Sequence, residues 1–99
     1  MINQSWTIDD GDLITELSTL FNHRRMQDRV FNALLYVNPI GVNFVRQDDF
    51  FMMELVDKEP GVVWYGFAKR NPLDPFSVHE AKKIALYRIV KSIEEFLGE

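Results

Sequence analysis

The residues with chemical potential gather in one stretch near the C-terminus, from Trp64 to Lys91. An aromatic strand candidate runs into a turn with two prolines, and a basic helix candidate follows. Free amides at a helix N-terminus attract phosphate, and aromatic rings stack on bases. The candidate ligand-binding residues are Trp64, Arg70, Asn71, Phe76, Lys82 and Arg88. This combination suits an anionic ligand with a flat ring.

The turn at residues 70–76 has two interpretations. In the functional one, Arg70 adds a bidentate grip on phosphate, and Phe76 or Trp64 stacks on a base. In the structural one, Phe76 is a hydrophobic staple before Ser77, and the prolines only stiffen the turn. The sequence leaves both open.

Two basic residues of the last helix stand out by their helical position. Lys82 falls inside the apolar stripe, where it either snorkels to water or holds a cation at the rim of a pocket. Arg88 lies beside the small residue Ala85, which leaves room for a ligand, although a solvated arginine explains it as well. Lys83 and Lys91 fall on the opposite face and are assigned to solvent.

Signatures of catalysis are missing from the chain. His23 and His79 are far apart, and neither has a metal-ligand partner at the usual spacing. The adjacent acidic pairs at 48–49 and 94–95 do not face each other on a helix. There is no cysteine, no glycine-rich phosphate loop and no nucleophile elbow. We therefore expect no enzyme, no metal and no cofactor.

Composition limits the partners of the chain. Its 99 residues suit one domain, 1–99, and the 46% of apolar residues suggest a homo-oligomer. A net charge of −4 disfavours nonspecific nucleic-acid binding. With no leader-like N-terminus and no apolar run of about 18 residues, we expect no membrane partner and a cytoplasmic location.

The first 38 residues are predicted to be helical. Asp9 or Asp10 can cap a short helix through Phe21, and a second helix follows until Pro39 stops it. Phe31 and Leu35 fall on the face opposite its main apolar stripe, so this helix is apolar on two sides and is either sandwiched in the core or shared with a partner. A strand from Arg29 to Val37 is the alternative.

From Ile40 onward, the spacing of apolar residues changes from the helical period to the two-residue period of β-strands. Residues 40–46, 50–56 and 62–69 predict a three-stranded antiparallel meander. Both faces of the third strand are apolar, which predicts cover on each side. Gly66 inside it indicates a bulge or a close approach by another backbone or a ligand.

The last helix begins with a capping box, Ser77 to Glu80. A stripe of apolar residues predicts packing on the sheet; it comprises Val78, Ala81, Ala85, Ile89, Ile93 and Phe96, widened by Leu86, Val90 and Leu97. The expected fold is α+β: N-terminal helices, the meander, and a long C-terminal helix packed on the sheet.

The segment 71–88 resembles the C-terminal part of a group of small phage and mobile-element proteins. The shared pattern is Asn71-Pro-x-Asp-x-Phe-Ser77, followed by Ala81-Lys-x-Ile-Ala85 and Arg88. One branch consists of anti-defence (anti-Thoeris) sponges that bind a cyclic ADP-ribose signal. The resemblance implies that Asn71 and Arg88 touch a nucleotide, in the host cytoplasm if the chain is phage-encoded.

Two functions are expected from these observations. The first is a non-enzymatic accessory protein that sequesters a small phosphorylated or nucleotide ligand to counter host defence. The alternative is a protein-interaction module that binds and blocks a host protein. Its contact surface would use the surplus aromatics and the two-sided second helix.

Overall fold

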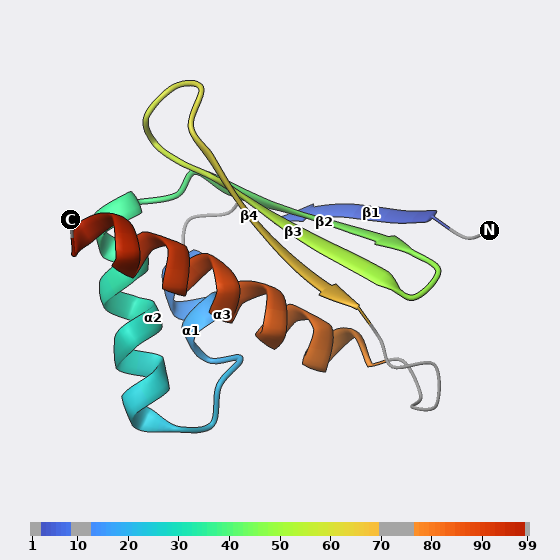
Figure 1. Ribbon diagram of the computed structural model, residues 1–99, viewed down its shortest axis with the longest axis horizontal. Helices are drawn as coiled ribbons and strands as arrows, with labels where there is room; N and C mark the ends of the chain where they lie inside the picture. The colour runs from blue at the N-terminus through green and yellow to red at the C-terminus, as the bar shows by residue number, and fades with distance from the viewer. Residues whose placement is uncertain (1–2, 9–12, 70–76, 99) are drawn as a thin grey trace.

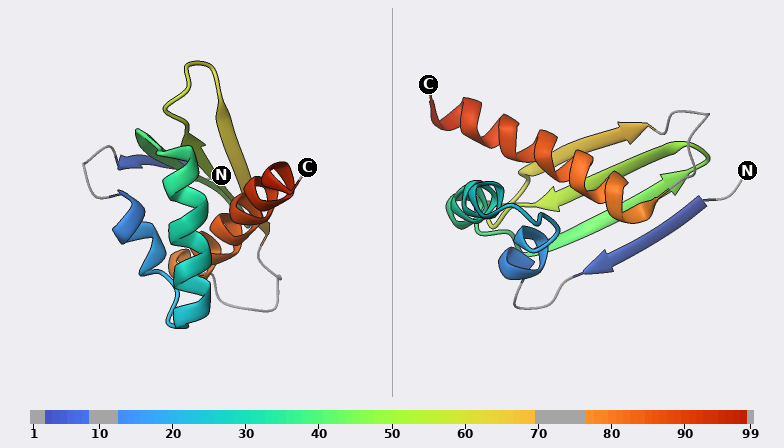
Figure 2. Two further views of the ribbon diagram at one scale, coloured as in Figure 1. Left: turned by 90° about the vertical axis from the view of Figure 1, so that its left-hand side faces the viewer. Right: turned by 90° about the horizontal axis from the view of Figure 1, so that it is seen from below.

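The fold places three helices on one face of a single antiparallel sheet (Figures 1 and 2). The computed structural model describes residues 3–8, 13–69 and 77–98. In chain order the elements are β1 (Asn3–Ile8), α1 (Leu13–Ser18), α2 (Arg24–Val37), β2 (Gly41–Gln47), β3 (Phe50–Val56), β4 (Val63–Lys69) and α3 (Val78–Leu97). The strand order is β1-β2-β3-β4. The predicted α+β class, the meander (β2 to β4) and the C-terminal helix are confirmed.

The N-terminal segment departs from the prediction, since Asn3–Ile8 is a strand and not part of a helix. β1 pairs antiparallel with β2 and extends the meander to four strands. Its six residues carry a weak local signal, and the pairing with β2 is long-range, so local periodicity could not find it. The predicted caps Asp9 and Asp10 lie outside the described residues.

The segment after residue 23 is helix α2, so the strand alternative for Arg29 to Val37 is wrong. Asn38 ends the helix in the left-handed conformation, and its N–H donates to the Leu34 carbonyl oxygen. Pro39 then prevents continuation. The predicted inner face is buried at Val30, Ala33, Leu34 and Val37.

The core lies between the sheet and the helices. α3 begins as predicted, with the Ser77 hydroxyl accepting a hydrogen bond from the Glu80 N–H at 3.3 Å. Most of its predicted stripe is buried against the sheet, but Phe96 and Leu97 are exposed. These two follow Ile93, the last buried position of the helix.

Gly66 is the point where α3 and β4 come closest. A Cβ built on Gly66 would lie 2.0 Å from the carbonyl oxygen of Ala85 and 3.0 Å from the Cγ1 of Ile89. The predicted close approach is thus made by the backbone of α3. The small side chain of Ala85, itself fully buried, lets the helix come this near.

No helix of the described residues covers the other face of the sheet (Figure 2). Tyr65 is 49% exposed and Phe67 is 41% exposed on this face. The prediction that β4 is covered on both sides is therefore wrong within this chain. Gly66 and Ala68, which point the other way, are buried under α3.

We expect Gly66→Ala to destabilise the fold by about 3 kcal/mol or more, because the added methyl overlaps helix backbone that cannot rotate away. Urea denaturation measures the change. The matched control is Gly98→Ala, whose φ is −75° and whose added Cβ would lie 3.3 Å from the nearest oxygen. A Gly66→Ala protein as stable as Gly98→Ala would show that this approach does not constrain the fold.

Candidate functional site

The structure describes three of the six residues predicted to bind a ligand: Trp64, Lys82 and Arg88. Arg70, Asn71 and Phe76 lie outside the described residues, as does the corner they belong to. Each of the three has its own partner in the fold. Their environments decide what each can do chemically.

Trp64 is tied to the turn between β3 and β4. Its indole Nε1 donates to Oδ2 of Asp57 at 3.1 Å, and the other oxygen of Asp57 accepts from the Glu59 N–H at 2.9 Å. The ring lies edge-on to Phe96, with centroids 6.1 Å apart. Trp64 therefore joins the turn to the end of α3.

Lys82 faces the sheet, as its place in the apolar stripe predicted. Its Nζ lies 4.7 Å from the ring centroid of Phe44, which is fully buried. A lysine ammonium above a ring face is attracted by the ring quadrupole. The side chain thus contacts the core while it remains half-buried.

Arg88 reaches from α3 to the edge strand β4. Its Nη1 donates to the carbonyl oxygen of Phe67 at 2.5 Å. A guanidinium carries five donors, so one such bond leaves several for another acceptor. The arginine is exposed, in a position to bind both the strand and a ligand.

A hollow of about 500 Å³ runs along the outer side of α3, and we call it the α3 groove. Its lining from α3 repeats at helical spacing, and Phe21 from the segment after α1 forms the facing wall. The lining residues are Phe21, Glu80, Lys83, Ile84, Tyr87, Arg88 and Lys91. Of the predicted site residues that the structure describes, Arg88 alone lines this groove.

The α3 groove is basic although the chain is acidic overall. Its lining holds three cations, Lys83, Arg88 and Lys91, against one carboxylate, Glu80. Lys83 is shared between the Glu80 carboxylate, 3.7 Å away, and the face of Phe21, 5.9 Å from the ring centroid. Cations beside aromatic and aliphatic walls can hold an anion that carries an apolar or flat group.

Lys83 and Lys91 were predicted to face solvent, and Phe21 was not among the predicted site residues. The signal that could have joined them is the spacing 80, 83, 84, 87, 88 and 91, which is one face of a helix. No local pattern could place Phe21 opposite that face. Its position follows from the packing of α1 and α2 against each other.

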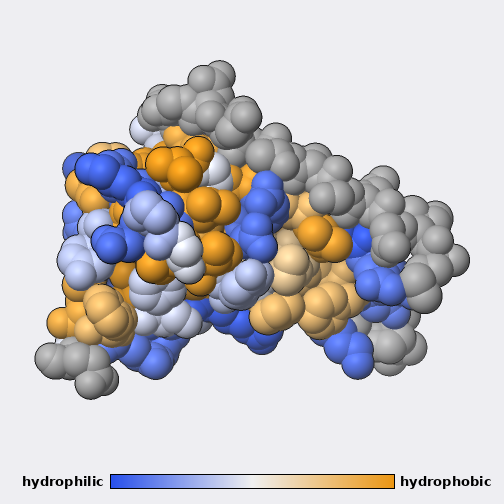
Figure 3. Space-filling view, turned by 90° about the horizontal axis from the view of Figure 1, so that it is seen from above, coloured by the Kyte–Doolittle hydropathy of each residue, from blue (hydrophilic) through white to orange (hydrophobic). Residues whose placement is uncertain are grey.

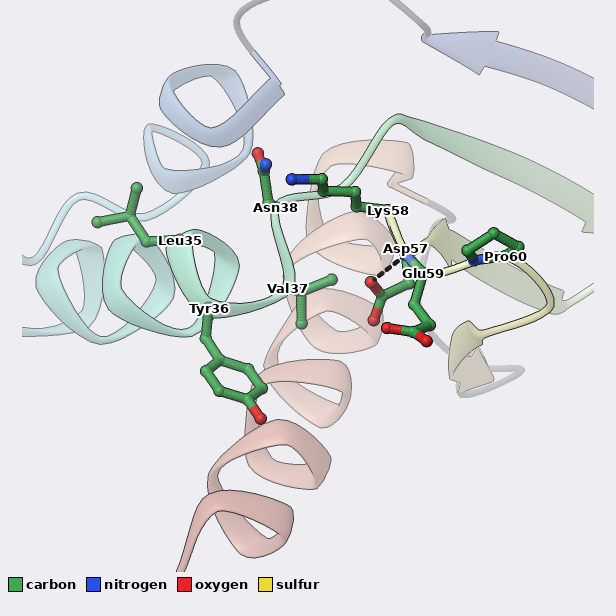
Figure 4. A pocket seen from close by; sticks show the side chains of 8 residues that line it. All are labelled: Leu35, Tyr36, Val37, Asn38, Asp57, Lys58, Glu59 and Pro60. Atoms are coloured by element: carbon green, nitrogen blue, oxygen red, sulfur yellow. Dashed lines mark hydrogen bonds between the residues drawn. The ribbon is translucent and has the colours of Figure 1, made fainter.

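A second hollow of about 560 Å³ lies between the end of α2 and the β3–β4 turn (Figure 4). Asp57, Lys58 and Glu59 give it a polar lining. Both oxygens of Asp57 already accept hydrogen bonds that hold the turn and Trp64. Figure 4 shows the Tyr36 ring directed away from these carboxylates. We interpret this hollow as a consequence of the turn's own hydrogen bonding.

An ion pair joins α2 to α3 beside the α3 groove. Arg29 Nε lies 3.0 Å from Oε2 of Glu94, and Arg29 Nη2 lies 2.6 Å from Oε1, a bidentate geometry. The guanidinium also stands 5.5 Å from the ring centroid of Tyr87, which lines the groove. The hydrogen bonds from Arg29 lower the pKa of Glu94, and the same bonds raise the pKa of Arg29.

Within the described ranges, no three His, Cys, Asp or Glu side chains gather where they could hold a metal ion. Nor is any helix there both long and apolar enough to cross a membrane. The arrangement that remains is a basic, partly aromatic groove. This groove can bind an anion. Among its described lining residues, no acid and base side chains lie at hydrogen-bond distance in the manner of a catalytic dyad.

Comparisons with family models, with curated proteins and with solved structures found no match. The resemblance of segment 71–88 to the phage sponges accordingly stays a prediction. The geometry of the α3 groove is the basis for a functional proposal.

The Arg29–Glu94 pair predicts a pH-dependent contribution to stability. Because the folded pKa of Glu94 is lowered, the contribution is present above the ordinary carboxyl pKa of about 4.5 and is lost as pH falls through the folded value. Both side chains are more than a third exposed, so we expect Glu94→Gln to cost only about 0.5–1 kcal/mol at pH 7.

Urea titrations of both proteins between pH 7 and about pH 3 test this, since the two should converge at the acid end. Glu95→Gln is the matched control, because its neighbouring carboxylate is exposed and takes part in no described contact. A difference between wild type and Glu94→Gln that does not shrink on acidification would contradict the assignment.

Proposed function

We propose that the protein is a non-catalytic binding protein that holds a small anionic ligand, a phosphorylated or nucleotide compound, in the α3 groove. The observation that carries the proposal is the cluster of Lys83, Arg88 and Lys91 beside Phe21 and Tyr87. Binding of such a ligand in an open groove needs a stacking surface and matched charge, and it needs no acid or base.

The charges of the groove favour an anion of more than one negative charge. The cations outnumber the carboxylate three to one, and Glu80 already lies beside Lys83. Arg88 can grip two phosphate oxygens at once with the N–H groups that do not bind Phe67. Lys83 and Lys91 add point charges about one and three helical turns from Glu80 along the same face.

The apolar part of the groove favours a ring. Phe21 and Tyr87 supply aromatic faces, and Ile84 adds an aliphatic surface to the lining. The Arg29 guanidinium contacts the Tyr87 ring and so restrains that ring at its side of the groove. The volume of about 500 Å³ is within the usual range for small-molecule sites.

The biological role follows from the resemblance and belongs to the same proposal. A protein that binds a cyclic ADP-ribose type of signal keeps it from a host immune effector. Arg88 is common to the resembling segment and to the α3 groove, which supports nucleotides as the first ligands to test. Asn71, Arg70 and Phe76 stay predictions, because they lie outside the described residues.

A thermal-shift panel tests the proposal with cyclic and linear adenine nucleotides, ADP-ribose and inorganic phosphate. A nucleotide at a hundred times its dissociation constant should stabilise the fold by about 2.7 kcal/mol. Because exposed phosphate contacts are screened by salt, the shift should shrink as salt is raised. If no nucleotide or phosphate raises the melting temperature at low salt, the α3 groove is not an anion site.

Substitutions locate the site. Arg88→Ala and Lys83→Ala should each abolish the nucleotide shift, while Lys58→Ala, in the other hollow, should leave it unchanged. Arg88→Ala should cost the free protein about 1 kcal/mol, since only its exposed bond to the Phe67 carbonyl is lost. A much larger loss of stability would make Arg88 a structural residue, and Lys83→Ala would then decide the location.

A second candidate is the protein-interaction module that blocks a host protein. The observation that favours it is the outer face of α2, where Phe31 is 41% exposed and Leu35 is 53% exposed. Apolar residues four apart on a helix can enter a groove of a partner. Leu35→Glu should then abolish inhibition of the target without changing nucleotide shifts, whereas Lys83→Ala should do the reverse.

A further inference from the structure

The uncovered side of the sheet carries several exposed aromatic side chains. We call the described part of it, over β2, β3 and β4, the open sheet face. Phe50, Tyr65 and Phe67 are 43%, 49% and 41% exposed there, and Val45 and Met52 are half-buried. Figure 3 shows hydrophobic side chains over much of this side, divided by a strip of hydrophilic atoms.

The aromatic rings of the open sheet face form one cluster. The Phe50 and Phe67 centroids are 5.3 Å apart, and Tyr65 is stacked on Phe67 at 6.5 Å with an angle of 13° between the rings. Packed rings at the surface are pre-organised, so little side-chain entropy is lost when a partner covers them. Aromatic clusters of this kind are enriched at interface cores.

The strand register arranges the open sheet face in rows. The middle row is Val45, Met52 and Phe67, which are cross-strand neighbours. The row on one side is Gln47, Phe50 and Lys69, and the row on the other side is Asn43, Glu54 and Tyr65. A basic row and an acidic row therefore flank an apolar one.

The acidic row is internally organised. Asn43 Nδ2 donates to Glu54 Oε1 at 2.6 Å, and the charge of Glu54 raises the pKa of Tyr65 beside it. The described open sheet face holds this one carboxylate and the one ammonium of Lys69, and is neutral, while the chain carries −4 in all.

We propose that the open sheet face is the interface with a second copy of this chain. A two-fold axis along the Val45–Met52–Phe67 row brings the Lys69 row of each copy over the Glu54 row of the other. The apolar rows then meet at the centre. Two like-charged chains can associate in this way because their excess negative charge lies on other surfaces.

The dimensions of the whole sheet, β1 included, limit such an interface to a modest size. Four strands about 4.8 Å apart, with about 3.3 Å per residue over seven residues, span roughly 19 by 23 Å. This is a flat area of roughly 440 Å² per copy before side-chain relief is added, against about 800 Å² for a standard interface. We infer a dimer of modest affinity that forms by aligned packing of two sheets.

Sedimentation equilibrium over a range of protein concentrations tests the proposal. The wild type should reach twice the 11.6 kDa mass of the chain as concentration rises. Met52→Glu should be a monomer, because it opposes two carboxylates at the axis. The control is Leu35→Glu on α2, an apolar residue that is 53% exposed and lies away from the open sheet face, and this variant should dimerise normally.

Charge exchange tests the symmetry itself. Lys69→Glu and Glu54→Lys should each weaken the dimer about tenfold or more, since Lys69 of one copy and Glu54 of the other lie on neighbouring strands across the interface and a like-charged pair there is repulsive. The protein with both substitutions should recover most of the lost affinity. Failure of this rescue, with both single variants folded, would overturn the proposed axis.

A wild-type experiment covers the case in which Met52→Glu does not fold. Amide exchange of Phe50–Val56 and Val63–Lys69 should slow as protein concentration rises, and that of Arg24–Val37 should not. A wild type that is monomeric at every concentration would overturn the proposal. Loss of the dimer in the Leu35→Glu variant would also overturn it. So would the finding that the protein stays monomeric and binds added single-stranded nucleic acid through the open sheet face.

Discussion

The contact on which the rest of the structure depends is the approach of the Ala85 carbonyl to Gly66. No side chain fits between them, since a Cβ on Gly66 would lie 2.0 Å from that oxygen. The approach holds α3 directly on β4 and buries its apolar stripe against the sheet. It also brings Arg88 within reach of the Phe67 carbonyl, on the edge strand that would otherwise present free backbone groups. A helix kept farther away would leave the core open on this side.

The position of α3 divides the molecule into surfaces of different character. Its inner side forms the core with the sheet, and its outer side forms the basic α3 groove. The Arg29–Glu94 pair holds α2 against α3 from the other direction, and Arg29 contacts the Tyr87 ring that lines the groove. Because all three helices lie on one face, the opposite face keeps its aromatic cluster in solvent (Figure 2). A net charge of −4 thus conceals a local excess of cations and a neutral sheet face.

Local signals explain which parts of the fold were predictable. The capping box at Ser77, the stop at Pro39 and the two turns of the meander are each specified by residues within a few positions of each other. Gly66 was also informative, since glycine within a strand indicates a close neighbour. β1 was missed because its pairing with β2 is long-range. The α3 groove was missed because Phe21 meets α3 only through the packing of α1 and α2. Of the predicted site residues, Trp64, Lys82 and Arg88 proved to have separate partners.

The sequence by itself determined the α+β class, the register-defining turns and the two-sided apolar character of α2 and β4. These depend on periodicity and turn chemistry, which act over short distances along the chain. The tertiary structure alone decided which of the two apolar faces the helices would cover, and which cations would stand together. The covered face of β4 is the one with Gly66 and Ala68, because only there is the strand surface small enough to admit a helix backbone. Tyr65 and Phe67, on the opposite face of β4, are exposed to solvent as a result.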